Sequence, residues 1–300
     1  MSALKTKYEF GRHETFTLRE GWLDKGLDHI VTNKGFKADL GTADELGLGK
    51  NMVKSLQYWL EATGLAGRKR DGTSKAVPPL LISGFGERLA GLDPHFEYSI
   101  STWYVHMMLA RRPASVWNWF FNDFRNGVFD RETSIESFQR HVREHALNQT
   151  TLSVLQREVA CLLGTYAALP PSEPLDPEDF TISPLRSLSL LVKHPDTGRY
   201  EKAVPLDVVP VEAFLACVQW LTEDADSASL PLSDLISRRN SPARLFNMDG
   251  DTINELAHKA AELHGGHGVR LSLLGSTRTI TMPSMNATDW YEMHFTRIGG

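Results

Sequence analysis

Polar and cationic side chains gather on one segment in the first third of the chain, where their spacing suits contact with nucleic acid. Residues 42–60 include a stretch of helical periodicity, and the face opposite its apolar stripe carries side chains that can reach phosphates or base edges. These side chains are Lys50, Asn51, Lys54, Ser55 and Tyr58. We therefore expect this face to enter the major groove of duplex DNA.

A second group of cations follows in a stretch rich in Gly, Ser and Thr. It holds four basic side chains opposed only by Asp71, and such local charge attracts phosphates even on an acidic protein. The four are Arg68, Lys69, Arg70 and Lys75. Residues 65–77 predict a strand, a turn at Asp71-Gly72 and a returning strand, which is the hairpin known as a wing. The basic tip of a wing grips the DNA backbone or the minor groove beside the recognition helix.

Two helices joined by a tight turn are needed to position the first group. Ala43 is small enough to lie where the helices cross, and Gly47 can adopt the left-handed conformation that ends the first helix. Leu48 fills the corner, and an apolar stripe seats the second helix on its partner. The stripe consists of Val53, Leu56 and Leu60. This spacing predicts a helix-turn-helix, which the hairpin extends to a winged helix.

Length and charge divide the chain into four segments. The 300 residues exceed one ordinary core, and the first third is basic, with 14 Lys and Arg against 11 Asp and Glu in the first 90 residues. We expect a winged helix-turn-helix over 1–90, a helical middle domain over 91–168, an acidic proline-rich linker over 169–182 and a carboxy-terminal α+β domain over 183–300. The predicted fold class is mainly α with small β-hairpins (α+β).

The carboxy-terminal unit repeats the order of helices followed by a hairpin. We expect a short helix over 233–239, a second helix capped by Asp249 or Asp251, and strands over 269–274 and 277–282. Because the charges of this winged-helix-like unit are mixed, we expect it to dock a protein partner or a second copy of the chain. DNA binding by this unit is a weaker alternative, which rests on three basic residues, Arg238, Arg239 and Arg244.

The overall composition excludes several classes of protein. Apolar residues make up 41% and charged residues 23%, as in an ordinary globular chain and unlike a disordered or fibrous one. No run approaches the ~20 apolar residues of a membrane helix, and residues 1–10 lack the pattern of a secretory signal, so we expect a cytoplasmic protein. Cys161 and Cys217 stand inside apolar stretches, which predicts buried thiols and neither a disulfide nor a zinc site.

Other side chains that could take part in catalysis or ligand binding have simpler structural interpretations. His13-Glu14 lacks the second histidine of a metalloprotease motif, so we expect a capping or salt-bridge role. The aromatic residues of the middle segment have few interleaved cations, since Arg111 and Arg112 precede Trp117 and only Arg125 follows closely, which favours a packed core over binding of single strands. They are Trp103, Trp117, Trp119, Phe120, Phe121, Phe124 and Phe129. We expect His264 and His267, which flank two glycines, to lie in a loop after a helix without binding metal.

One group of side chains leaves a metal-dependent nuclease as a minor alternative function. Asp93, Glu97 and His106 have the chemistry to converge on a metal ion. Asp93-Pro94 also makes an ordinary turn, however, and His106 falls in an apolar helix. We therefore expect no metal, no cofactor and no enzymatic activity.

The opening of the chain has no periodicity that explains it, yet it resembles a known family. The segment from Phe10 to Gly26 reads FGRHETFTLREGWLDKG. Further marks are residues 46–53, 93–106 and 120–122, with weaker ones at 183–185 and 241–246. Together they are similar to an uncharacterised bacterial family, the domain of unknown function four thousand and seven. Its members are encoded beside phosphoadenosine-phosphosulfate-reductase-like proteins, in neighbourhoods linked to DNA phosphorothioation and phage defence, so the resemblance implies a DNA-related role without a defined reaction.

The expected function is that of a non-enzymatic DNA-binding accessory or regulatory protein of a bacterial DNA-modification and phage-defence system. The expected partners are double-stranded DNA and, from the resemblance, a phosphoadenosine-phosphosulfate-reductase-like protein. Formation of a homodimer is a further alternative, and no membrane partner is expected. The alternative from a different class is an adaptor that docks a sulfurtransferase-like partner enzyme through both winged-helix units.

Overall fold

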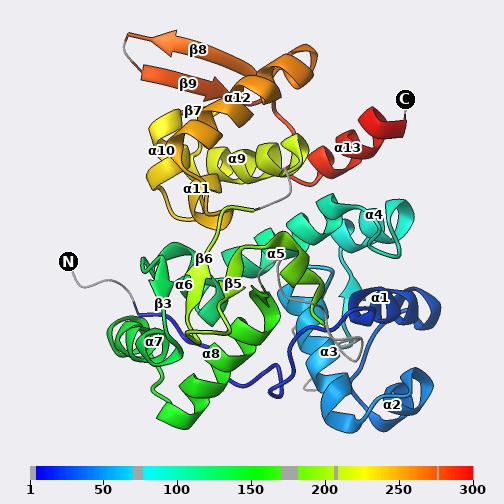
Figure 1. Cartoon of the computed structure of the whole chain (residues 1–300). Helices are drawn as coiled ribbons and strands as arrows, with labels where there is room; N and C mark the ends of the chain where they lie inside the picture. The colour runs from blue at the N-terminus through cyan, green and yellow to red at the C-terminus, as the bar shows by residue number, and fades with distance from the viewer. Residues whose placement is uncertain (1–4, 70–76, 170–181, 206–208, 276, 300) are drawn as a thin grey trace.

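The structure is a computed structural model that describes residues 5–69, 77–169, 182–205, 209–275 and 277–299. Figure 1 shows a mixed α+β protein in which helices dominate and the short strands form small sheets. The expected α+β class is confirmed at this level. Within the described ranges, no helix is long and apolar enough to cross a membrane.

The first part of the chain folds into four helices and a two-stranded sheet. The elements are α1 (Trp22–Asn33), α2 (Leu40–Leu46), α3 (Lys50–Ala62), β1 (Ala66–Gly67), β2 (Leu81–Ile82) and α4 (Gly84–Leu92). The predicted pair of helices and its turn are confirmed, because Gly47 ends α2 in the left-handed region with φ 63°. Ala43 is buried beneath this turn and accepts the Leu48 N–H, and the apolar stripe of α3 has no exposure.

The hairpin differs from the prediction in its second strand. β1 pairs antiparallel with β2, whose residues lie beyond the predicted range 65–77, while residues 70–76 of that range lie outside the described residues. Pro78 and Pro79 have no N–H to donate to a ladder of hydrogen bonds, and the described residues that pair with β1 are Leu81 and Ile82. The predicted turn at residues 71–72 lies outside the described residues.

The middle of the chain consists of helices around a large aromatic interior. The elements are α5 (Ser99–Arg111), α6 (Val116–Asn122), β3 (Val128–Phe129), α7 (Arg131–His145), α8 (Leu152–Tyr166) and β4 (Ala167–Ala168). All seven residues of the predicted aromatic cluster are buried, which confirms that they form a core. Cys161 and Cys217 are buried free thiols, as predicted.

The rest of the chain mixes helices and strands around α9. The helical segments are η1 (Pro184–Leu188), α9 (Val211–Ala225), α10 (Leu232–Ser237), α11 (Pro242–Leu245), α12 (Gly250–His264), η2 (Gly265–His267) and α13 (Asp289–Gly299). The strands are β5 (Leu191–Lys193), β6 (Tyr200–Lys202), β7 (Ser229–Pro231), β8 (Arg270–Leu274) and β9 (Thr277–Thr281). The predicted cap at Asp249 and the hairpin of β8 and β9 are confirmed, and β7 adds a third strand beside β9.

A four-stranded sheet brings together segments from both sides of residues 169–182. Its order is β3-β6-β5-β4, with β4 and β5 parallel and the other neighbours antiparallel. Two of its strands therefore precede the predicted linker and two follow it. The division of the chain into four segments stays a prediction.

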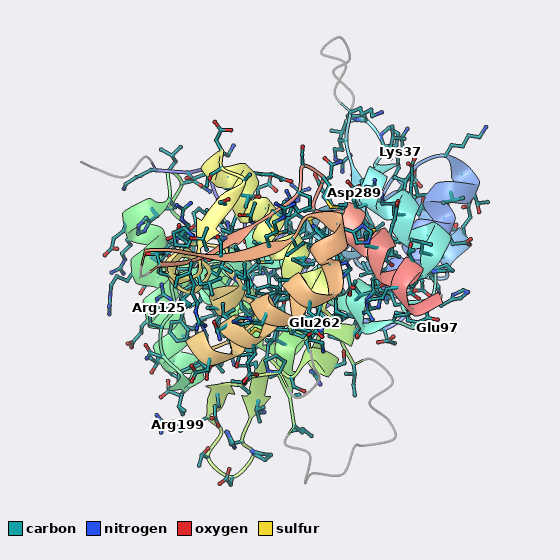
Figure 2. The ribbon with its side chains drawn as sticks, turned by 90° about the horizontal axis from the view of Figure 1, so that it is seen from above. Lys37, Glu97, Arg125, Arg199, Glu262 and Asp289 are labelled. Carbon is teal, nitrogen blue, oxygen red and sulfur yellow. The ribbon has the colours of Figure 1, made fainter. Side chains whose placement is uncertain are left out.

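The last helix, α13, packs against α4 and α5 from the first half of the chain and against α9 from the second. Arg88 of α4 donates hydrogen bonds to Thr288, Asp289 and Glu292 over 2.6–2.8 Å. Figure 2 shows Asp289 where α13 meets the amino-terminal helices. These charge-assisted contacts tie the end of the chain to its first part.

On its other side, α13 contacts a buried carboxylate. Glu212 of α9 is fully buried and accepts hydrogen bonds from His264, His294 and Arg297 over 2.6–3.1 Å. Burial alone raises the pKa of the Glu212 carboxyl, but these hydrogen bonds outweigh it and hold the pKa well below its usual value. The carboxylate is therefore charged and links α9, α12 and α13.

Gly86 of α4 is a position where the fold leaves no room for a larger side chain. A Cβ there would lie 2.1 Å from the Leu65 carbonyl oxygen and 2.9 Å from Ile82 Cγ1. Gly86→Ala should therefore lower the free energy of unfolding by about 1–3 kcal/mol in urea denaturation. Gly84→Ala is the matched control in the same helix, because nothing lies within 4 Å of its added Cβ. An equal loss in both variants would contradict the steric argument.

Glu212→Gln keeps the shape of the side chain and removes its charge. The free energy of unfolding at neutral pH should fall by about 2–3 kcal/mol, because the donors lose hydrogen bonds to a charged acceptor. A carboxyl whose pKa is lower in the folded state stabilises the protein above its unfolded pKa, here 4.5, and that contribution is lost as the pH falls further. The difference between wild type and variant should thus shrink between about pH 6 and pH 3. A difference that is constant over this range would rule out the charge as the cause.

Candidate nucleic-acid interface

The accessible part of α3 is confined to its amino-terminal end. Lys50, Asn51 and Lys54 are exposed, as the predicted interface requires. Beyond Lys54, only Gln57 and Glu61 are partly exposed, and the other residues of the helix are buried. The cations that could meet a phosphate therefore project from the start of the helix.

Backbone donors at the start of α3 add to these side chains. Gly49 is the N-cap and supplies no side-chain hydrogen bond to the first N–H groups, and the first turn holds no acidic residue. Uncapped N–H groups and the helix dipole both favour an anion at this position. The amino-terminal end of α3 thus suits a phosphate, with Lys50 beside it.

Two residues of the predicted DNA-binding set are wrong, because they are buried. Ser55 has no exposed surface, and Tyr58 is 6% exposed, with its hydroxyl accepting the Trp117 indole N–H over 2.8 Å. Helical periodicity predicts one free face of α3, whereas the helix is covered on two sides. α1 packs on one side, and Trp117 of α6 and the imidazole of His13 lie against Tyr58 on the other.

The described part of the hairpin carries two of the four predicted cations. Lys69 is exposed, in line with the predicted contact. Arg68 is partly buried, and its guanidinium donates to the Pro78 carbonyl, so this side chain holds the base of the hairpin together. Arg70 and Lys75 lie outside the described residues.

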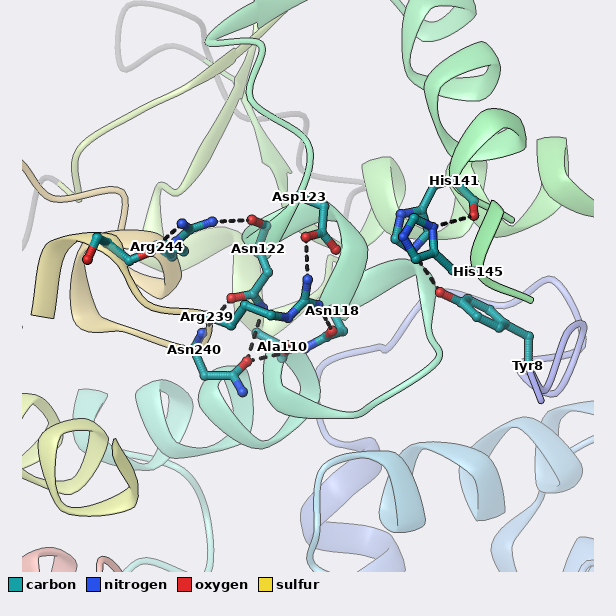
Figure 3. A network of polar contacts seen from close by, with 11 residues as sticks. Tyr8, Ala110, Asn118, Asn122, Asp123, His141, His145, Arg239, Asn240 and Arg244 are labelled. Carbon is teal, nitrogen blue, oxygen red and sulfur yellow. Dashed lines mark hydrogen bonds and ion pairs between the residues drawn. The ribbon is translucent and has the colours of Figure 1, made fainter. Parts of the chain in front are cut away.

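Arg239 and Arg244, which carried the weaker DNA option, serve a polar network that joins α6 to the turn between α10 and α11 (Figure 3). Arg239 pairs with Asp123 and donates to the Asn118 side-chain oxygen over 2.6 Å. Arg244 donates to the Asn122 carbonyl over 2.5 Å. Both guanidinium groups therefore already have acceptors within the protein.

Asn240 completes this network from the turn. Its side-chain oxygen accepts hydrogen bonds from Asn118 and Asn122, and its backbone N–H donates to Asn122 (Figure 3). The neighbouring Arg238 pairs with Asp234 of α10 over 2.9 Å. The network is thus a structural connection, and nothing in it favours DNA contact by these arginines.

The three residues of the nuclease alternative do not converge. Asp93 accepts a hydrogen bond from the backbone N–H of Glu97, as expected of a turn. His106 is fully buried, where its Nε2–H donates to the Leu245 carbonyl and its Nδ1 accepts from the Tyr166 hydroxyl, both over 2.8 Å. Burial lowers the pKa of His106 to about 4, so the ring is neutral. Among the described residues, no group of three His, Cys, Asp or Glu side chains is placed to hold a metal ion.

His264 differs from its predicted role. It is the last residue of α12 and is buried, so it does not lie in a loop. Its Nε2 lies 2.7 Å from the Glu212 carboxylate. The two residues are 52 positions apart, so no local pattern in the sequence indicates the pair. His267 lies exposed in η2, in line with its predicted place after a helix.

A turn that precedes α1 lies against the exposed end of α3. Residues 11–15 form this turn, and the Glu14 carboxylate lies 3.6 Å from Lys54 Nζ. The Glu14–Lys54 ion pair confirms the salt-bridge interpretation of His13-Glu14, and His13 lies 3.3 Å from the Glu158 carboxylate. No local pattern in the sequence indicates the contact with Lys54, because the turn and α3 lie far apart in the chain.

Comparisons with known proteins agree with this fold. A crystal structure of magnesium ion-bound SspB is 22% identical with a TM-score of 0.82, and another crystal structure of SspB is 24% identical with a TM-score of 0.80. Each alignment covers 99% of this chain and 89% of the other, and at this identity the likeness shows a shared fold. No curated protein gives a significant match. Residues 10–288 match the family described as "Protein of unknown function (DUF4007)", and the resemblance is thereby confirmed: the chain belongs to this family.

Proposed function

We propose that the chain binds duplex DNA with the amino-terminal end of α3 and with the hairpin of β1 and β2, arranged as a winged helix. In this arrangement Asn51 reaches base edges in the major groove, and Lys50 and Lys54 contact phosphates. Lys69 extends the contact to the flanking backbone, with Arg70 and Lys75 as further candidates. The chain acts as an accessory or regulatory protein and has no catalytic role.

The exposure pattern of α3 is the observation that supports this proposal. The side chains of α3 that are exposed are two lysines and an asparagine, and they lie in the first two turns after an uncapped helix start. Recognition helices contact base edges with their amino-terminal residues, and phosphates bind favourably at helix amino termini. The same end of one helix therefore combines groups for sequence readout with groups for phosphate binding.

The biological setting in the proposal rests on the family. The resemblance implies a bacterial DNA-modification and phage-defence system, with a phosphoadenosine-phosphosulfate-reductase-like protein as a partner. A protein that holds such an enzyme on DNA needs affinity for the duplex but no reaction of its own. This makes accessory binding the function most consistent with the geometry of α3.

Lys50→Ala and Asn51→Ala should have different effects on DNA binding. Lys50→Ala should weaken binding to all duplexes alike and reduce the slope of log K against log salt by about 0.9, because one phosphate contact is lost. Asn51→Ala should instead reduce the preference for the best sequence by about 1–3 kcal/mol. Fluorescence anisotropy with labelled duplexes at several salt concentrations measures both.

Tyr58→Phe is the control for these variants. It leaves the buried Trp117 N–H without its acceptor while changing no exposed surface, so the free energy of unfolding should fall by about 1–3 kcal/mol at unchanged DNA affinity. If Lys50→Ala and Tyr58→Phe alter affinity alike, the proposed interface is wrong. The same holds if wild-type protein fails to bind any duplex at low salt.

A second candidate function is magnesium-dependent DNA cleavage, and one comparison favours it. A structure of similar fold is that of a magnesium ion-bound protein. Magnesium is often held by one or two carboxylates plus water and substrate phosphates, so such a site does not require three clustered side chains. Incubation of supercoiled plasmid with the purified chain in magnesium or in EDTA tests this function. Nicked product formed only with magnesium supports cleavage, and intact plasmid favours binding alone.

A further inference from the structure

The turn of residues 11–15 places an acidic side chain on the proposed DNA-binding surface. Glu14 lies 3.6 Å from Lys54, with side-chain exposures of 34% and 43%, so both groups are within reach of solvent. Among the described residues, Lys50 at the start of the same helix has no carboxylate within ion-pair distance. One of the two helix cations is therefore neutralised within the protein and the other is not.

The backbone of this turn is strained at the residue that makes the contact. Glu14 and Thr15 both adopt the left-handed region, with φ of 49° and 69°. This region is unfavourable for a residue with a Cβ, and more so for β-branched threonine. Two consecutive residues in this conformation persist only where the surrounding structure imposes it.

Buried contacts on both sides of Glu14 impose this conformation. The Gly11 N–H donates to the Glu158 carboxylate over 2.6 Å, and the Thr15 N–H donates to His13 Nδ1 over 3.1 Å. His13 is 1% exposed and lies between Glu158 and the ring of Tyr58. His13 Nδ1 accepts the Thr15 N–H, and its Nε2 faces the Glu158 carboxylate over 3.3 Å. The turn is thus a fixed strap whose anchors are separate from the DNA-binding residues.

We propose that this strap is autoinhibitory: Glu14 occupies Lys54 in the free protein, and a DNA phosphate must displace it before Lys54 can contribute to binding. The inference rests on the proposed DNA-binding function and assigns a regulator to that same surface. A solvent-exposed ion pair is weak enough to be exchanged, since its partners remain hydrated. A duplex ligand that binds more strongly, or a change that displaces Glu14 from Lys54, would release this lysine and strengthen binding to the DNA backbone.

Glu14→Gln tests the proposal, because it removes the competing charge and keeps the size of the side chain. Duplex affinity at low salt should rise about threefold, the range of an exposed ion pair. The salt slope should grow by up to about 0.9, because Lys54 then engages a phosphate without leaving an unpaired carboxylate. Asp44→Asn is the matched control, since it removes one exposed acidic charge from α2 of the same helix-turn-helix without an ion pair among the described residues. It should change affinity by less than Glu14→Gln.

A double-mutant cycle with Lys54→Met separates local competition from general repulsion. If Glu14 acts on Lys54, Glu14→Gln should have no effect on affinity once Lys54 is replaced. If Glu14→Gln raises duplex affinity equally with and without Lys54, the proposal of autoinhibition is wrong, because the gain then comes from general repulsion between Glu14 and DNA. Weaker binding by Glu14→Gln would also overturn it and would show that Glu14 orients Lys54. If neither wild type nor any variant binds duplex DNA, the proposed function itself is contradicted. If wild type binds and Glu14→Gln has the same affinity, only the proposal of autoinhibition is contradicted.

Discussion

The packing of the carboxy-terminal half of α3 into the aromatic core governs what the rest of the helix can do. Trp59 lies with its ring centroid 5.3 Å from that of Trp117, and Tyr58 accepts the indole N–H of the same residue. These contacts fix the depth and rotation of the helix, so its exposed side chains lie in its first turns and only Gln57 and Glu61 are partly exposed beyond them. A large ligand can therefore meet α3 only at its positive end, where the backbone dipole adds to the lysines.

The sequence was sufficient where the signal is local. Gly47 ends α2 because a left-handed residue is needed there, and Asp249 caps α12 through a hydrogen bond to the N–H three residues later. The burial of the aromatic cluster was also predictable, since few cations are interleaved with it. Pro78-Pro79 also carried a local signal, because neither residue can donate to a ladder, and using it would have moved the second strand of the hairpin to its observed place.

The sequence was insufficient where a partner comes from a distant segment. Helical periodicity correctly assigned Val53 and Leu56 to a buried face, but it contains no information about a second covered face, and so Ser55 and Tyr58 were misassigned. The carboxylate beside His264 and the one beside Lys54 come from other elements, and neither spacing nor composition indicates them. Packing of one element on another determines such pairs, and this information is spread over the whole chain.

The clamp between Arg88 and α13 also has a consequence for synthesis in the cell. The acceptors of Arg88 lie 200 to 204 residues further along the chain, so the amino-terminal part cannot complete its contacts until residues 288–292 have been synthesised. A prematurely terminated polypeptide would leave the rings of Phe85 and Tyr104 without Tyr291, which covers both in the finished protein. Termination before residue 291 would thus yield a polypeptide with uncovered aromatic surface, a feature that quality-control proteases recognise.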